Sequence, residues 1–258
     1  MTPENASSVP PSVPQGTQTL ARGLDVLRAI ADGAADLKAV VEATGIGRST
    51  AHRLIQMLEL RDFVRVAGGR SYALGPQLID YGFRALHQNP LPVLARPILE
   101  RLADTVKDTV HLAVEDGGQV LYLEKIPGSR GAEMRSRIGL RMPLTRTGIG
   151  KSLLLDQPSR WAEQFTVECP KEPSPEDVAR FNTLMQDYAA QDSTMDLEEN
   201  EPGIRCVAAP VRDARGAIVA AISVAATAPY MPAERMQSLG AVVRQAAQAI
   251  GRELGRRA

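Results

Sequence analysis

The sequence has few of the features that mark secreted, membrane-spanning or zinc-binding proteins. Its 258 residues include only two cysteines, Cys169 and Cys206, and their wide separation favours neither a disulfide framework nor a zinc site. The longest apolar runs, such as residues 217–226, are far shorter than the roughly 20 residues that a membrane-spanning helix needs. The first residues also lack the basic start and apolar centre of a secretory signal. We therefore expect a cytoplasmic protein.

The chain has no excess of charge of either sign, because 30 Lys and Arg residues balance 30 Asp and Glu residues. This balance excludes a protein that binds nucleic acid over its whole surface, but it allows a basic patch on one face. The length allows one large domain or two smaller ones, and we favour two.

The chain divides into four segments by composition and pattern. Residues 1–17 contain four prolines among polar residues, which predicts a disordered arm. A helical and hairpin-forming domain is predicted over 18–75, and a linker helix over 76–90 ends where a proline disfavours its continuation. Residues 91–258 then form the second and larger domain.

Three helices followed by a β-hairpin are predicted in the first domain. Apolar residues recur at the spacing of an amphipathic helix, Asp36 is a suitable N-cap, and Gly45 supplies the left-handed residue that stops a helix. Alternating residues around a Gly-Gly pair then predict two short strands. The expected elements are helices over 20–31, 36–44 and 48–61 and strands over 63–66 and 71–74.

The second domain is predicted to mix helices with strands that are joined in pairs. Such a pattern favours an antiparallel sheet with helices packed on it, so the fold class is α+β. The expected helices cover 92–107, 150–155, 159–165, 175–190 and 233–254. The expected strands cover 110–115, 120–126, 134–138, 206–211 and 218–225.

The first domain has the order of a winged helix-turn-helix, in which the second helix of the pair enters the major groove of DNA. Arg48, His52 and Gln56 are spaced by four and form a polar stripe opposite the apolar face of the third predicted helix. Residues 45–72 contain five arginines and two acidic residues, so this segment is basic in a neutral chain. A solvated amphipathic helix is the alternative interpretation, and the following hairpin favours DNA binding over it. The expected DNA contacts are Arg48, Ser49, Thr50, His52, Arg53, Gln56, Arg70 and Tyr72.

Three stretches resemble the N-terminal domain of the IclR family of bacterial transcription regulators: ARGLDVLRAIADG, TGIGRSTAHRLIQMLELRDFV and YALGPQLIDYG. Three more are similar in order and spacing to that family's C-terminal domain: HLAVEDGGQVLYLEKI, MRSRIGLRMPLTRTGIGKSLL and GIRCVAAPVRDARGAIVAAISV. The resemblance implies an N-terminal winged helix-turn-helix, a linker helix, and a GAF-like α/β effector domain with an antiparallel sheet. It also implies a homo-oligomer, a dimer or a tetramer, that pairs through its DNA-binding domains.

The resemblance further implies a pocket for a small organic molecule in the second domain. Helix-start amides would hold an acid group, Asp196 and Ser223 would bind hydroxyls, and Met and Ile side chains would shape the walls. The residues carried over are Met134, Met142, Arg146, Gly148, Ile149, Asp196, Ile204, Cys206 and Ser223.

Several of these residues have plainer alternative interpretations. Arg146 replaces a small residue of the family and favours an acidic effector, a sugar acid or an aromatic acid, but it could equally point to solvent. Cys206 could be a small buried apolar residue, and Asp196 could belong to a solvated acidic loop. Ala225 stands where some family members have a second serine.

Catalytic motifs are missing from the sequence. The run Gly150-Lys151-Ser152 matches the end of a phosphate-binding loop, but Thr145 stands where that motif needs its first glycine. The three histidines lie in different predicted elements, and no nucleophile elbow or zinc-protease motif occurs. We therefore expect no enzyme, no cofactor and no metal, but a DNA-binding transcription regulator of a catabolic operon. The alternative is a small-molecule-binding or enzymatic domain whose N-terminal helices contact proteins.

Overall fold

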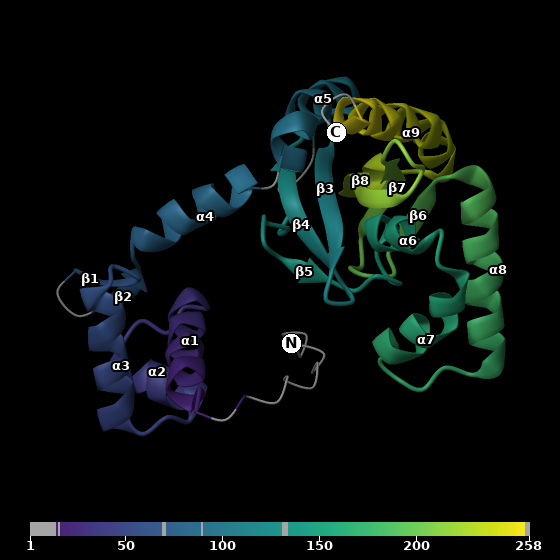
Figure 1. Cartoon of the computed structure of the whole chain (residues 1–258). Coiled ribbons are helices and arrows are strands. Elements are labelled where there is room, and N and C mark those ends of the chain that lie inside the picture. Colours follow the sequence, from purple (N-terminus) through teal and green to yellow (C-terminus); the bar gives the residue numbers. More distant parts are fainter. Residues whose placement is uncertain (1–13, 15, 69–70, 89, 131–133, 256–258) are drawn as a thin grey trace. The chain divides into compact units, whose positions relative to one another are not determined.

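The computed structural model describes residue 14 and residues 16–68, 71–88, 90–130 and 134–255 of the chain. Its contacts divide the chain between Asn89 and Pro90 into two compact units, which are described separately below. Figure 1 labels the elements of both units.

The first unit consists of three helices, a β-hairpin and a further helix. Asp36 caps the second helix by accepting a hydrogen bond of 2.8 Å from the amide of Ala39, and Gly45 ends this helix with a φ of 67°. The sequence predicted both ends correctly. The elements are α1 (Gln18–Ala31), α2 (Leu37–Thr44), α3 (Arg48–Leu60), β1 (Val64–Ala67), β2 (Ser71–Leu74) and α4 (Gln77–Gln88).

A small apolar core joins α1, α2, α3 and the hairpin. Val26 and Val40 are fully buried in it, together with Ala51 and Ile55 from the inner face of α3. Because these two α3 residues are four apart, the opposite face of the helix is turned away from the core. The position of the core therefore determines which side of α3 is free to meet another molecule.

The second unit is built on a six-stranded antiparallel sheet with the strand order β5-β4-β3-β8-β7-β6. Its strands are β3 (Thr109–Asp116), β4 (Gln119–Ile126), β5 (Arg141–Met142), β6 (Thr194–Leu197), β7 (Ile204–Arg212) and β8 (Ile218–Thr227). Its helices are α5 (Pro90–Val106), α6 (Gly148–Leu154), α7 (Pro158–Glu168), α8 (Pro175–Gln191) and α9 (Ala233–Gly255), with a short 3-10 helix, η1 (Ala228–Tyr230).

Helices cover both faces of this sheet. Figure 1 shows α5 and α9 lying together over one face, and their apolar residues form one core with Val110 and Leu112 of β3. The opposite face packs against α6, α7 and α8, and Ala113 of the same strand belongs to that second core. Since alternate residues of a strand point to opposite faces, each central strand contributes to both cores. The predicted α+β class with an antiparallel sheet is confirmed.

Two strands at the edges of the sheet differ from the prediction. The strand expected over 134–138 is wrong, because this segment is irregular and its backbone carbonyls accept hydrogen bonds from the side chain of Lys125 instead of from a strand. The edge strand is the short β5, which follows it. The sequence also missed β6, whose four residues are too few to show a clear alternation.

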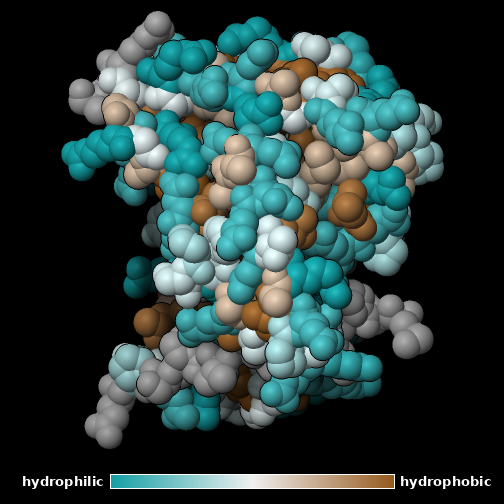
Figure 2. Space-filling view, turned by 90° about the vertical axis from the view of Figure 1, so that its right-hand side faces the viewer, coloured by the Kyte–Doolittle hydropathy of each residue, from teal (hydrophilic) through white to brown (hydrophobic). Residues whose placement is uncertain are grey.

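The surface in the view of Figure 2 is mainly hydrophilic, with hydrophobic residues scattered among polar ones. A scatter of this kind is normal for a surface that faces water. Within the described residues, no helix has both the length and the apolar character that crossing a membrane requires.

Two glycines allow α6 to pack directly on the strands and on its own entry loop. A Cβ atom on Gly150 would lie 2.4 Å from the carbonyl oxygen of Leu144, and one on Gly148 would lie 2.7 Å from Sγ of Cys206. No side chain is therefore tolerated at Gly150 without a movement of the backbone.

Replacement of Gly150 by alanine should lower the free energy of unfolding of the second unit by about 1 to 3 kcal/mol, because a methyl group must displace backbone. Denaturant unfolding followed by the fluorescence of Trp161, the single tryptophan of the chain, measures this change. Gly240→Ala in α9 is the matched control, since its Cβ would meet neighbours at ordinary distances of 3.5 Å and more. A loss at Gly240 as large as that at Gly150 would contradict the close packing of α6.

Candidate functional site

The outer face of α3 carries six polar side chains that make no hydrogen bond or ion pair with any other described residue, and toward the end of the helix it also carries the exposed Met57 and Leu60. The helix begins after Gly47, which has no side chain to cap the first amide groups. These amides and the neighbouring hydroxyls suit a phosphate oxygen. All six residues expected here to contact DNA are exposed: Arg48, Ser49, Thr50, His52, Arg53 and Gln56.

In the described part of the wing, which is the hairpin of β1 and β2, Tyr72 is turned toward the core. Tyr72 is half-buried, packs against the core of the first unit, and donates its amide to the carbonyl oxygen of Ala35 at 2.7 Å. It therefore fixes the hairpin to the helices. Arg70, the other expected wing contact, lies outside the described residues.

In the second unit, the strand register brings polar residues from four strands side by side. His111 of β3 pairs with Ser223 of β8, while Cys206 of β7 pairs with Ala225 of β8 and with Asp196 of β6. Because paired residues share a face of the sheet, these side chains all lie on the side covered by α6. They form the floor of a cavity.

The cavity has a volume of about 110 Å³. This is less than the roughly 150 Å³ of a cavity that holds a benzene molecule, so the space as it stands suits a short chain or one part of a larger ligand. Its walls and mouth come from β4, from the loops around 134–142 and 196–204, and from the start of α6. The residues that line it beside the floor are Tyr122, Met134, Arg135, Ser136, Leu140, Met142, Thr147, Ile149, Asn200, Glu201 and Ile204.

His111 is a neutral hydrogen-bonding group at the floor of the cavity. Its burial, together with the nearby charge of Lys125, lowers its pKa to about 3. Its Nε2 lies 2.7 Å from Oγ of Ser136, and its Nδ1 lies 3.5 Å from Oγ of Ser223. The imidazole therefore links the floor to the segment above it and does not act as a cation.

Asp196 is the acidic group of the cavity interior. Its side chain is only 4% exposed, and this burial raises its pKa to about 6, although the amide of Glu199 donates to Oδ1 at 2.8 Å and Lys151 lies nearby. Burial also raises the pKa of Cys206 to about 12, so its thiol is neutral. These interior groups are therefore hydrogen-bonding groups, and the charges of Lys151 and Lys125 act on them from close by.

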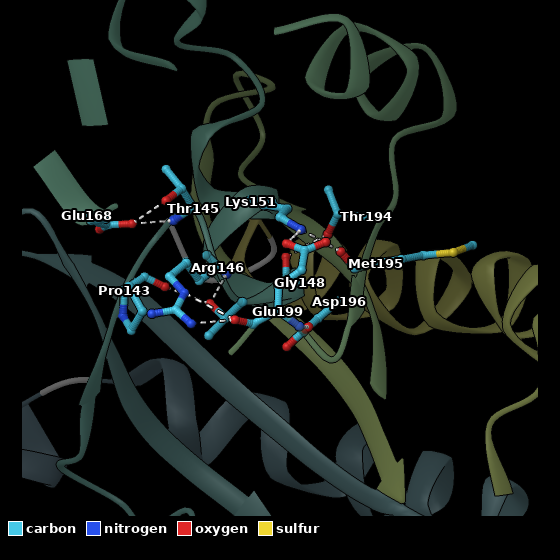
Figure 3. Close-up of polar contacts among 12 residues, drawn as sticks. Pro143, Thr145, Arg146, Gly148, Lys151, Glu168, Thr194, Met195, Asp196 and Glu199 are labelled. Carbon is cyan, nitrogen blue, oxygen red and sulfur yellow. Dashed lines mark hydrogen bonds and ion pairs between the residues drawn. The ribbon is translucent and has the colours of Figure 1, made fainter. Parts of the chain in front are cut away.

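A buried ion pair holds the loop after β6 against α6, as Figure 3 shows. Lys151 is fully buried, and its Nζ donates to the carbonyl oxygen of Met195 at 3.0 Å and binds the carboxylate of Glu199. The backbone oxygen of Glu199 accepts hydrogen bonds from Nε and Nη2 of Arg146, at 3.1 and 2.6 Å. Lys151 and Arg146 are therefore both bound by one residue of this loop.

The entry loop of α6 is fixed from the other side by Glu168 of α7. Its carboxylate accepts hydrogen bonds from the amides of Leu144 and Thr145 at 2.8 and 2.7 Å and from Oγ1 of Thr145 at 2.5 Å. Thr147 then caps the helix by accepting from the amide of Gly150 at 3.0 Å. These contacts, several of which are drawn in Figure 3, place Ile149 in the cavity wall.

The run Gly150-Lys151-Ser152, considered in the sequence as the end of a phosphate-binding loop, serves packing in this fold. Oγ of Ser152 lies 2.7 Å from Oγ1 of Thr194, which in turn donates to the carbonyl oxygen of Gly148 at 2.6 Å. Among the described residues, no group of His, Cys, Asp and Glu side chains could hold a metal ion.

The structure brings together most of the residues that the resemblance assigned to a pocket. Arg146 does not line the cavity but is bound to the loop after β6, and Gly148 lies beneath Cys206 without lining it. Asp196 lies on a strand and is buried, so the alternative of a solvated loop is wrong. The cavity-lining members are Met134, Met142, Ile149, Asp196, Ile204, Cys206 and Ser223.

Sequence reasoning missed several residues that line the cavity. The alternation of residues in β3 predicted that His111 lies on the other face of the sheet from Val110 and Leu112. Only the structure showed that this other face is also covered, so that His111 is buried there. Arg135 and Ser136 gave no comparable signal, because their segment was taken for a strand.

The raised pKa of Asp196 predicts a pH-dependent stability. Because the folded state binds a proton more tightly than the unfolded chain, its free energy of unfolding should fall as pH rises from about 4 to 6, by about 2 to 3 kcal/mol. Asp196→Asn should lack this fall and should be more stable than the wild type at pH 7.5. Urea unfolding followed by Trp161 fluorescence over this pH range tests it. Asp104→Asn, an exposed change in α5, should follow the wild type, and an Asp196→Asn curve parallel to the wild type would refute the prediction.

Comparison with known proteins identifies both units. Residues 19–68 match the model of the IclR helix-turn-helix domain, and residues 83–252 match that of the bacterial transcriptional regulator IclR C-terminal domain. The HTH-type transcriptional regulator RhmR of Escherichia coli (strain K12) is 32% identical over 92% of this chain and 93% of its own length.

Two solved structures are also similar. The IclR protein of Thermotoga maritima has a TM-score of 0.75 and 27% identity, and the match covers 92% of this chain and 98% of that one. An IclR homologue from Microbacterium hydrocarbonoxydans, solved in complex with 4-hydroxybenzoate, has a TM-score of 0.80 and 23% identity, covering 93% and 100%. Matching family models and similarity along nearly the whole length show that this chain belongs to the IclR family of DNA-binding bacterial transcription regulators.

Proposed function

We propose that this protein is a homo-oligomeric regulator of a catabolic operon whose affinity for its operator is set by a small organic acid. It acts in the cytoplasm and is not an enzyme. The observation that carries the proposal is the presence in one chain of exposed polar side chains on a helix-turn-helix and, in a second unit, of a cavity lined by both apolar and hydrogen-bonding side chains. In this proposal, residues 18–75 read DNA, residues 76–90 link the two domains, and residues 91–258 bind the effector.

At the operator, Arg48 and Arg53 contact phosphates, and His52 and Gln56 contact base edges in the major groove. These assignments are supported by the positions of the side chains around the helix, because all four are exposed on α3. The N-terminus of the helix adds backbone amides that can bind a phosphate. Ser49, Thr50, Arg70 and Tyr72 complete the proposed interface.

Self-association is supported by apolar side chains that the first unit leaves in water. Leu20 and Leu24 on α1 are 66% and 57% exposed, and Ile79 and Phe83 on α4 are 63% and 60% exposed. Each pair is four residues apart on its helix, so each forms one stripe that a second copy could bury. A symmetric dimer then matches a roughly palindromic operator.

The effector acts by linkage between the two units. A ligand that binds one arrangement of the protein more tightly changes operator affinity by its differential binding free energy, typically about 1 to 3 kcal/mol. The 4-hydroxybenzoate complex of the Microbacterium relative supports an aromatic or otherwise hydroxylated acid as the ligand class. The serine, aspartate and histidine side chains that line the cavity in this chain could bind the hydroxyl groups of such a ligand.

Substitutions on α3 should separate general from specific binding. Arg53→Ala should weaken binding to operator and to unrelated DNA by similar factors and lower the salt slope by about 1, because it removes a phosphate contact. Gln56→Ala should weaken only operator binding, by about 1 to 3 kcal/mol. Fluorescence anisotropy with both duplexes at several salt concentrations measures these effects. Lys38→Ala on α2, an exposed cation outside the α3 face, is the control.

The proposed function is tested by a mobility-shift assay on the DNA upstream of the protein's own and neighbouring genes. Lactate, glycerate, gluconate, benzoate and 4-hydroxybenzoate are added in turn. Sequence-specific binding that one acid alters is expected. Absence of specific binding by the intact oligomer at low salt would overturn the proposal and favour the alternative of protein contacts through the N-terminal helices.

A further inference from the structure

Tyr122 is a buried tyrosine that lines the cavity. It lies in β4 and pairs with Ala113 of β3, on the face of the sheet that α6 covers. Its side chain is only 8% exposed and belongs to the cavity wall. Its hydroxyl makes no hydrogen bond with another described residue. The phenol group is therefore a polar group that is largely removed from water and is not used by the described part of the protein.

The position of this phenol is fixed by its neighbours. Its ring lies against that of His111, with 4.9 Å between the ring centres. The backbone amide of Tyr122 donates to the carbonyl oxygen of Leu140 at 3.1 Å. The side chains of Cys206 and Asp196, which belong to the cavity floor, act electrostatically on the phenol. The hydroxyl therefore lies at the inner end of the cavity.

The phenol is a hydrogen-bond donor at neutral pH. Burial raises its pKa above the ordinary value of a tyrosine, and the nearby Cys206 and Asp196 side chains raise it further. It therefore keeps its proton, and a protonated phenol can donate one hydrogen bond. A buried polar group nearly always has a partner in a native structure, because an unpaired one has lost its water without compensation. An oxygen atom of a ligand in the cavity would supply that partner.

The other hydroxyl groups that line the cavity already have partners in the protein. Oγ of Ser136 and Oγ of Ser223 both lie within hydrogen-bonding distance of the ring nitrogens of His111. Oγ1 of Thr147 donates to the carbonyl oxygen of Pro143 at 2.9 Å and caps α6. Among the described hydroxyl groups of the cavity, that of Tyr122 is therefore the one whose donor is available to a ligand.

We propose that Tyr122 is a specificity-determining residue of the effector site, and that its hydroxyl donates a hydrogen bond to an oxygen atom of the effector. This inference rests on the proposed function, because it concerns the effector of that function. The acceptor is an oxygen of the acid, either in its carboxylate or in a hydroxyl group. A ligand without oxygen at this end would leave the buried phenol unpaired, so the site discriminates against it.

The test compares calorimetric titrations of the full-length wild type and the Tyr122→Phe variant. The ligands are the acids of the panel above and propionate, which lacks the hydroxyl group of lactate. The variant keeps the ring and removes one oxygen, and it should weaken binding of the effector acid at least fivefold because the ligand oxygen loses its donor. Tyr188→Phe is the matched control: this tyrosine is also buried but does not line the cavity, so the affinity should change less than twofold.

Pairs of acids that differ by one hydroxyl group identify the oxygen that Tyr122 contacts. Lactate and propionate form one pair, and 4-hydroxybenzoate and benzoate form another. An effect of Tyr122→Phe that is confined to the hydroxylated member supports the inference and assigns the contact to the hydroxyl. An equal effect on both members supports it and assigns the contact to the carboxylate. Unchanged affinity for every acid that binds would overturn the inference.

Urea unfolding without ligand, followed by Trp161 fluorescence, gives a second readout. Tyr122→Phe should leave the unfolding midpoint unchanged or raise it, because its hydroxyl has no hydrogen bond to lose. Thr194→Val removes a buried hydroxyl that donates to the carbonyl oxygen of Gly148 at 2.6 Å and lies 2.7 Å from Oγ of Ser152, so it should lower the midpoint. An equal loss in both variants would show that the phenol is used within the protein and would overturn the inference.

The two proposals fail separately. If no acid of the panel binds while operator binding is intact, the inference about Tyr122 is overturned together with the acid effector, and the DNA-binding function stands. If operator binding is missing while Tyr122→Phe weakens binding of an acid, the proposed regulator fails and the assignment of Tyr122 to the ligand site stands.

Discussion

The buried ammonium group of Lys151 is the constraint on which the effector unit depends. A charge removed from water must be paired and hydrogen-bonded, and the partners available to Lys151 are the carboxylate of Glu199 and the carbonyl oxygen of Met195. Both partners lie on the chain that enters and leaves Asp196. The loop after β6 must therefore close against α6 wherever Lys151 is buried, and this closure forms one wall of the cavity.

This constraint also decides the electrostatics of the cavity. Lys151 and Arg146 are both bound to Glu199. The buried Asp196 therefore forms no ion pair with either of these cations. Lys125 lies at the other side of the cavity, where its charge helps to keep His111 neutral. The polarity of the interior follows from the way in which the fold satisfies its own buried charge.

The first unit was predictable from sequence because its structure is encoded by neighbours in the chain. The cap at Asp36, the stop at Gly45 and the phase of α3 are all local signals. In the second unit the central strands were also predicted from the alternation of their residues, but the strands at the edges of the sheet were not. The segment over 134–138 has the composition of a strand, and its conformation is decided by the distant Lys125 side chain.

The residues of the pocket also divide into those that the sequence predicted and those that it did not. Ser223 and Cys206 were found through the family resemblance, and His111 was visible in the alternation of its strand. Arg146 was assigned a role in the pocket that its binding to Glu199 does not support, since its partner lies 53 residues along the chain. Such long-range pairing has no signature in a single sequence. The partner of each charged side chain could therefore be identified only from the structure.

A double-mutant cycle on Lys151 and Glu199 tests the central constraint most directly. The free energy of unfolding of the second unit, followed by Trp161 fluorescence, is measured for Glu199→Met, Lys151→Met and the double variant. We expect Glu199→Met alone to cost about 3 to 5 kcal/mol, because it leaves a fully buried ammonium unpaired, and the double variant to regain most of that loss. Additive losses in the double variant would show that the two charges do not depend on each other and would contradict the account.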